Sequence, residues 1–292
     1  MSAVPAPAQT TARKLRHFLV FAVIALASPA IAQDFSSPPV PPIAAAPPGS
    51  ASVGPATFTR WSGFYLGGEA SFNYGQTNFS GTTQPLVALA LQNTVVESEF
   101  APSQLQALGN GANSAFGFGG FLGYNTQWQD VIVGVEADYT RTSLSMTAPS
   151  TAAISRSFSP AAGNVTSVTI QNANARLSLS DYAEARARAG YIIGTVLPYG
   201  FLGVAVGRSS YSASIEVDAT CTGGGECGGY PLIPSSGQNN ALLYGLAAGA
   251  GVDWALLPNF FLRGEVEVVQ FASVGNTALT IFDARVGAGF KF

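Results

Sequence analysis

The chain has 292 residues, of which 47% are hydrophobic and 10% are charged, and its formal net charge is −3. This composition is too apolar for a disordered protein and too poor in charge for a typical soluble enzyme. It also lacks the basic patches of a nucleic-acid-binding protein. The length fits one large domain or two small ones.

The first 32 residues have the pattern of a secretory signal peptide. Three basic residues within 13–16 precede an apolar run, 18–32, that ends in small side chains. We expect cleavage after Ala32; the alternative is an uncleaved anchor helix. Cleavage would remove three basic residues and no acidic one, so the net charge becomes 10 − 16 = −6. It would also remove His17, the only histidine.

Residues 33–60 are rich in proline and small side chains. Such a segment cannot build a core and is typical of an extended linker. At Trp61 the character of the sequence changes, and no later apolar run is long enough for a transmembrane helix. The sequence therefore predicts a signal peptide (1–32), a linker (33–60) and one domain (61–292).

Within this domain, apolar and polar residues alternate, which is the period of a β-strand. In the first such segment, Phe64 and Phe72 fall on one face, and Tyr65 and Glu69 on the other. A helix is the alternative for 182–191, but the charges there occupy every second position, and a helix would scatter them around its circumference. The pattern predicts eight strands: 63–74, 115–126, 130–146, 176–191, 197–217, 241–254, 260–271 and 279–292.

One predicted strand, 197–217, has an ambiguous phase. Its apolar face is formed either by Tyr199 and Phe201 or by Leu202 and Val204. The choice decides which of these side chains face the interior of the sheet, and the local pattern leaves both alternatives open.

The predicted connections alternate in length. Tight turns follow 115–126, 176–191 and 241–254, whereas a loop of about forty residues follows Tyr74 and loops of roughly twenty to thirty follow Met146 and Val217. Short turns at one end and long loops at the other are typical of outer-membrane barrels.

The two faces of the predicted sheet differ in a way that favours a membrane. One face is rich in Ala, Val, Leu and Phe, with Tyr and Trp near the strand ends, as at membrane interfaces. A sheet in lipid must close so that its backbone satisfies its own hydrogen bonds. We therefore predict an all-β fold, an eight-stranded antiparallel transmembrane up-and-down β-barrel whose long loops are extracellular and whose linker 33–60 is periplasmic.

Charged side chains alternate with this apolar face and would line the lumen, the interior of the barrel. Buried charges must be paired or hydrated, and eight strands leave no wide aqueous bore. A salt-bridged plug is thus favoured over an ion-selective channel. The predicted network comprises Glu69, Glu136, Asp138, Glu184, Arg186, Arg188, Asp253, Arg263, Glu265, Glu267, Asp283, Arg285 and Lys291.

The last strand ends on two aromatic residues of the apolar face, Phe290 and Phe292. Chain termini usually fray and are polar, so alternation up to the last residue indicates a strand with a structural task. In a barrel this strand must pair with the first one to remove the sheet edges.

Four stretches, 61–75, 119–139, 185–207 and 284–292, resemble the small outer-membrane proteins of alphaproteobacteria, a porin-like surface-protein family among the OmpA/OmpX-like eight-stranded barrels. The resemblance covers 61–292. It implies an outer-membrane location, periplasmic termini, and insertion by the barrel-assembly machinery, which would read the C-terminal aromatic strand with Phe290 and Phe292.

Two cysteines, Cys221 and Cys227, frame a glycine-rich loop of an exported protein. This context predicts a disulfide. Metal binding is the weaker alternative, because two sulfurs without histidine make a poor zinc site.

The sequence argues against an enzyme, because the mature chain would lack the histidine that most barrel hydrolases use as a general base. We expect no cofactor and no nucleic acid. The favoured function is a structural surface barrel that supports envelope integrity and presents loops to extracellular ligands. A narrow porin-like channel for ions or small solutes is the alternative.

Overall fold

A computed structural model describes residues 60–148, 153–161, 164–222, 229–274 and 277–292. The predicted signal peptide, 1–32, and the predicted linker apart from Arg60 lie outside the described residues, so both stay predictions.

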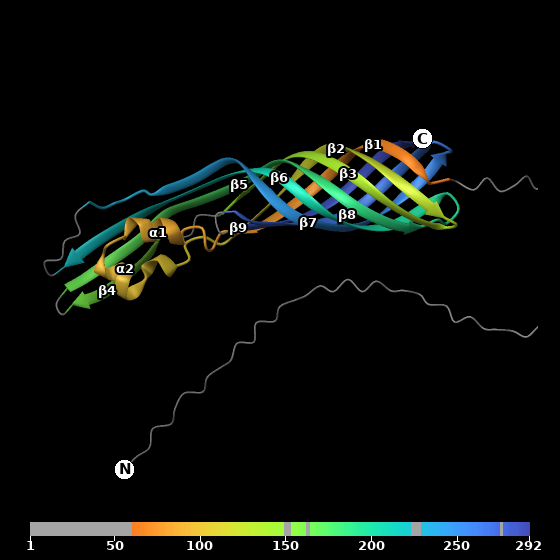
Figure 1. The fold of residues 1–292 in the computed structure, drawn as a ribbon. Coiled ribbons are helices and arrows are strands. Elements are labelled where there is room, and N and C mark those ends of the chain that lie inside the picture. Colours follow the sequence, from red (N-terminus) through yellow and green to blue (C-terminus); the bar gives the residue numbers. More distant parts are fainter. Residues whose placement is uncertain (1–59, 149–152, 162–163, 223–228, 275–276) are drawn as a thin grey trace, which may run out of the picture. The chain divides into compact units, whose positions relative to one another are not determined.

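Eight antiparallel strands close into a barrel, as predicted (Figure 1). Each strand pairs with the next along the ring, and the last pairs with the first over the register Tyr65↔Lys291 to Thr77↔Leu279. The final strand thus removes the edge of the sheet. The ring consists of β1 (Gly63–Asn78), β2 (Asn110–Trp128), β3 (Val131–Thr147), β5 (Asn164–Tyr191), β6 (Val196–Thr222), β7 (Ser235–Leu257), β8 (Phe260–Val274) and β9 (Thr277–Lys291).

The apolar face points outward along the ring. Val135 is 63% exposed and Val286 is 67% exposed, although both are apolar. The phase of β6 is resolved: Tyr199 and Phe201 are buried inside, and Leu202 is exposed. The rings of Tyr199 and Phe201 fill part of the lumen, and Leu202 faces lipid.

A ninth strand, β4 (Ile154–Ala161), was not predicted. It forms a hairpin with the first part of β5 and lies outside the ring. The segment predicted as a loop after Met146 is therefore partly strand. The segment is rich in Ser, Thr, Asn and Ala, and register shifts at Gln171/Asn174 and Leu179/Asp181 interrupt the alternation on which the prediction depended.

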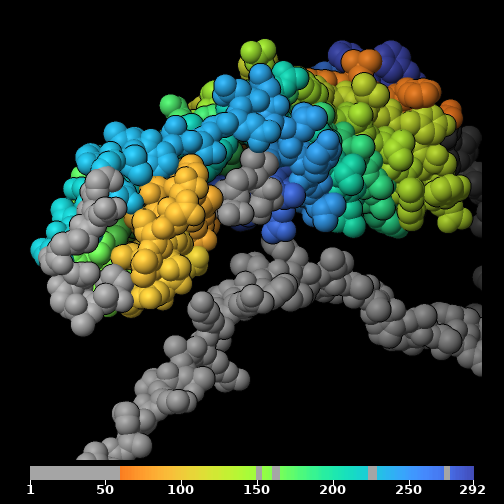
Figure 2. Space-filling model, turned by 60° about the vertical axis from the view of Figure 1, so that its left-hand side comes forward, coloured from red at the N-terminus to blue at the C-terminus, as the bar shows by residue number. Residues whose placement is uncertain are grey.

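The predicted forty-residue loop contains helices α1 (Gln84–Ala90), α2 (Val95–Phe100) and the short 3-10 helix η1 (Pro102–Gln104). Thr94 caps α2 by accepting a hydrogen bond from the Glu97 amide, and Pro85 lies in the first turn of α1. Figure 2 shows this yellow segment packed alongside the extended strands.

Beyond one end of the barrel, β4 to β7 and the helices form an extension with an apolar core (Figure 1). Leu86, Val87 and Val96 of the helical segment join one buried cluster with Val168, Ile170, Ile215 and Val217 of the strands. The extension lies at the end with the long connections. The short turns, Arg60 and the C-terminus lie at the other end.

Closure of the ring predicts resistance to detergent. Unboiled protein in sodium dodecyl sulfate is expected to migrate differently from boiled protein, because no open edge strand offers a starting point for unfolding. Gel electrophoresis of the refolded chain checks this. Equal mobility of the two samples would contradict a closed barrel.

Candidate functional site in the barrel lumen

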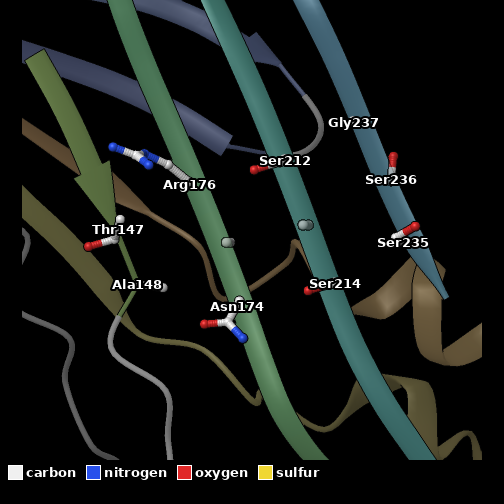
Figure 3. A pocket seen from close by; sticks show the side chains of 11 residues that line it. Thr147, Ala148, Asn174, Arg176, Ser212, Ser214, Ser235, Ser236 and Gly237 are labelled. Carbon is white, nitrogen blue, oxygen red and sulfur yellow. The ribbon is translucent and has the colours of Figure 1, made fainter. Parts of the chain in front are cut away.

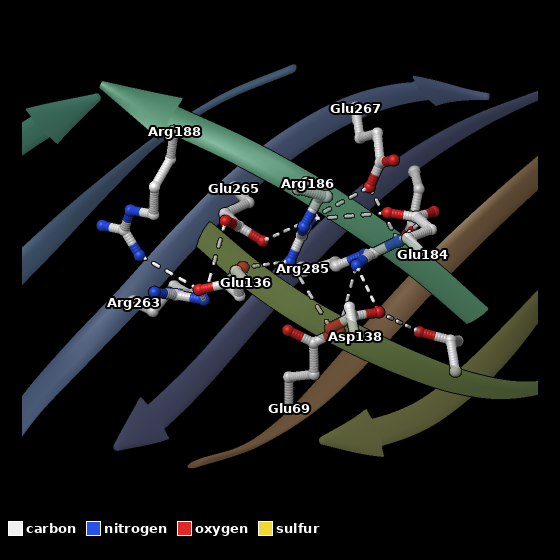
Figure 4. Close-up of polar contacts among 12 residues, drawn as sticks. Glu69, Glu136, Asp138, Glu184, Arg186, Arg188, Arg263, Glu265, Glu267 and Arg285 are labelled. Atoms are coloured by element: carbon white, nitrogen blue, oxygen red, sulfur yellow. Dashed lines mark hydrogen bonds and ion pairs between the residues drawn. The ribbon is translucent and has the colours of Figure 1, made fainter. Parts of the chain in front are cut away.

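Strand register brings the predicted charges to matching heights inside the barrel. Glu136 of β3 lies opposite Arg186 of β5, and Asp253 of β7 lies opposite Arg263 of β8. Because alternate residues point inward, these neighbouring strands place opposite charges side by side. Figure 4 shows the resulting network across the lumen.

The part of the network nearest the short turns contains Arg188 and Arg263 with three carboxylates. Arg188 contacts Asp253 at 2.6 Å and Glu136 at 3.1 Å, and Arg263 contacts the same two carboxylates, each at 2.8 Å. The Tyr199 hydroxyl donates a hydrogen bond to Glu265 at 2.6 Å. These groups hold β3, β5, β6, β7 and β8 together from inside.

Five carboxylates surround Arg285 farther along the lumen. The guanidinium lies 2.6 to 3.4 Å from their oxygens, and its side chain is fully buried. The Tyr182 hydroxyl donates to one of them, Asp283, at 2.8 Å. The five carboxylates are Glu69, Asp138, Glu184, Glu267 and Asp283.

Arg186 joins the two parts. It contacts Glu136 at 2.5 Å on one side and lies 3.5 Å from Glu267 on the other. Its guanidinium also stacks on the ring of Phe201 at 4.5 Å. Of the thirteen predicted network residues, all except Lys291 therefore take part in ion pairs.

Lys291 faces inward, as the other members of the predicted network do, but its contacts differ from theirs. Its ammonium group lies over the ring of Trp61 at 3.9 Å and donates a hydrogen bond to the Arg60 carbonyl at 3.1 Å. Within the described part of the chain, no carboxylate lies within 4.0 Å of it. Lys291 is the last residue of β9. It therefore lies on the short-turn side of the network, next to a layer of aromatic residues.

The aromatic layer closes the short-turn end of the lumen. The layer contains Trp61, Tyr65, Phe121, Ile132, Leu197, Tyr199, Phe201, Ala255 and Phe261, all at least 93% buried. Inward glycines make room for the rings: a Cβ at Gly67 would collide with Phe121, and one at Gly249 would collide with Phe201. The sequence placed Tyr65 on the inner face but did not predict the layer. The pattern that could have revealed it is an aromatic residue paired with an inward glycine on the neighbouring strand.

An apolar layer closes the opposite end. Its side chains are at most 4% exposed: Leu144, Met146, Leu177, Leu179, Leu243, Val269, Phe271, Leu279 and Ile281. On β5 the layer was hidden by the register shift at Leu179/Asp181, which changes the parity of the inward residues. The lumen is thus filled by three successive layers, aromatic, ionic and apolar.

The ionic layer contains more acids than bases. Eight carboxylates share four arginines, a formal charge of 4 − 8 = −4. In each of the five carboxylates around Arg285, one buried oxygen accepts no hydrogen bond from the described residues. This side of the network can attract protons or cations electrostatically.

No group of three His, Cys, Asp or Glu side chains in the described ranges is arranged to hold a metal ion. Among the helices in the described part of the chain, none has the length and apolarity to span a membrane.

The predicted disulfide stays a prediction, because Cys227 lies outside the described residues. Phe290 and Phe292 lie on the outer face, 53% and 77% exposed. Their recognition during insertion also stays a prediction.

Residues 43–292 match the family described as outer membrane protein beta-barrel domain. The chain belongs to this family. It is accordingly an outer-membrane protein. None of the curated proteins matches the chain.

Among solved structures, the chain is similar to the Neisserial surface protein A (15% identity, TM-score 0.37, 79% of this chain and 98% of that one). It is also similar to the attachment invasion locus protein Ail of Yersinia pestis (14%, 0.30, 79% and 99%). A third similar structure is the outer membrane protein OprG from Pseudomonas aeruginosa (11%, 0.34, 79% and 96%).

Proposed function

We propose that this outer-membrane barrel is a structural surface protein that supports envelope integrity and holds a rigid extracellular platform. The observation that carries the proposal is the filled lumen. The ionic layer is sealed by the aromatic layer at the short-turn end, which we place in the periplasm, and by the apolar layer at the end with the extension, which we place outside the cell. Water and ions need a continuous polar path, and these two layers interrupt it.

The extension supports the second half of the proposal. Strands β5 and β6 are 28 and 27 residues long, well beyond the 9 to 11 or so that a membrane requires. Their outer parts share an apolar core with α1 and α2. A surface built on such a core keeps its shape, as a binding platform for extracellular ligands requires.

Planar-bilayer recording tests the proposal. The refolded barrel is expected to give a flat current trace, because both sealing layers would have to move for an ion to pass. The gel-mobility difference between unboiled and boiled samples verifies that the reconstituted protein is folded.

A narrow channel is the alternative, favoured by the excess of carboxylates around Arg285. Steady openings whose ion preference changes in a Glu136→Gln/Asp138→Asn variant would establish the channel and refute the sealed lumen. We propose no catalytic role. The proposal includes a closer relationship to the porin-like proteins of alphaproteobacteria. It also includes recognition of Phe290 and Phe292 by the barrel-assembly machinery.

A further inference from the structure

The outer wall of β3, β5 and β6 carries rows of polar side chains directly beyond the lipid-facing band. These rows follow from the strand register. The first row is Arg141, Asp181 and Arg208; the second is Ser145, Ser178 and Ser210; the third is Thr147, Arg176 and Ser212. We call this surface the polar wall.

The first row lies at the height of lipid head groups. Arg141 is two residues beyond Tyr139, and Arg208 is two residues beyond Val206, on the same outward faces. Tyrosine marks the interface between hydrocarbon and head groups in barrels. The two arginines therefore extend from the protein where the phosphates of the outer leaflet lie.

The arginines of the first row are available for a ligand. Arg141 is exposed and forms no ion pair with the described residues, and Arg208 reaches Asp181 only at 4.0 Å with 57% of its side chain exposed. Two strand spacings separate them, about 10 Å between Cα atoms. Long side chains can converge from this distance on one phosphate group.

The second and third rows offer hydroxyl groups and one more guanidinium. Ser145 and Ser178 lie 3.0 Å apart, and Arg176 donates to Ser145 at 2.8 Å. A groove of about 490 Å³ is lined by the whole third row and continues to Ser214 and Ser235 (Figure 3). Hydroxyls and amides that line a groove are suited to sugar hydroxyl groups.

The basic character is confined to this side of the barrel. In the described residues of β1, β2, β7, β8 and β9, no lysine or arginine points outward; Arg263, Arg285 and Lys291 are buried. Two acids, Glu216 and Asp218, lie farther along β6, and the side-chain amides of Gln171 and Asn172 donate to Glu216 at 3.1 and 2.6 Å. A first row of two arginines and one aspartate, and above it a hydroxyl surface with one further arginine, thus lie together on one wall.

We propose that the polar wall binds the phosphorylated sugar head group of an outer-leaflet glycolipid. Arg141 and Arg208 hold the phosphate, and the serine and threonine rows contact the sugars. The bound glycolipid would fix the orientation of the barrel about its axis and hold the base of the extension at the membrane surface. This inference goes beyond the proposed function and holds whether or not the lumen conducts.

The test is glycolipid binding by the full barrel in phosphatidylcholine nanodiscs, titrated with a bisphosphorylated disaccharide glycolipid. A basic side chain near an anionic surface contributes about 1 kcal/mol, which is about fivefold in affinity. Arg141→Gln is therefore expected to bind about fivefold more weakly than the wild type, and Arg141→Gln/Arg208→Gln about 25-fold more weakly. Gel mobility shows which variants are folded.

Arg156→Gln is the matched control, because Arg156 is an exposed arginine of β4 away from the polar wall. Arg156→Gln should bind the glycolipid like the wild type. The wild type should bind the dephosphorylated glycolipid about as weakly as the double variant binds the phosphorylated one. Inorganic phosphate should not displace the glycolipid, since it lacks the sugar contacts. Wild-type binding by the folded Arg141→Gln variant, an equal loss in Arg156→Gln, or displacement by inorganic phosphate would each overturn the proposal.

Discussion

Arg285→Ala should be the most destabilising substitution in this barrel. It removes the guanidinium around which Glu69, Asp138, Glu184, Glu267 and Asp283 gather, and it leaves five buried carboxylates in excess. Removing one partner of a buried ion pair costs about 3 to 5 kcal/mol. We expect a loss of at least this size in the free energy of unfolding, measured by urea titration in lipid vesicles, or failure to refold.

Arg208→Ala is the control for this prediction. Arg208 is also an arginine on a barrel strand, but it is 57% exposed and reaches its carboxylate only at 4.0 Å. Exposed pairs contribute at most about 1 kcal/mol. If the two variants unfolded at the same urea concentration, the ionic layer would not be a main support of the barrel.

Val135→Arg should be the second most harmful change. Val135 is the middle outward residue of the apolar run on β3, between Val131 and Tyr139, and it is 63% exposed. An arginine on the lipid face at the bilayer midplane costs about 2 to 4 kcal/mol. Urea titration in vesicles is expected to show this loss in the free energy of unfolding.

Ser143→Arg provides the comparison on the same strand and face. Ser143 lies beyond the apolar band, where a charge meets head groups and water, and the expected change is within about 0.5 kcal/mol. A Val135→Arg variant as stable as Ser143→Arg would show that the outer face of β3 is not in hydrocarbon.

The membrane-spanning part of the fold was predictable because lipid and lumen impose opposite demands on successive residues. Val133 and Val135 face lipid while Glu136 and Asp138 face the ionic layer, so a period of two is visible without any structure. The same constraint identified twelve of the residues that form ion pairs. It also placed Lys291 on the inward face, where it is 8% exposed, but alternation reveals only the side of the sheet and not the partner, which for Lys291 is the Trp61 ring.

The extension was much less predictable, since both sides of a strand there can be polar. The hairpin of β4 and β5 and the helices α1 and α2 have no lipid face to mark them. Their positions depend on contacts distant in sequence, such as Val87 with the cluster that includes Ile215.

The sequence by itself determined that the chain forms a closed sheet of eight strands with an apolar exterior and a charged interior. It did so because outward residues must be compatible with lipid and inward residues with the polar lumen. Only the tertiary structure decided which charges pair, that the aromatic and apolar layers fill the two ends of the lumen, and that three rows of side chains align to form the polar wall. Those features arise from strand register and from bulges, which bring distant segments to a common height and which local alternation does not encode.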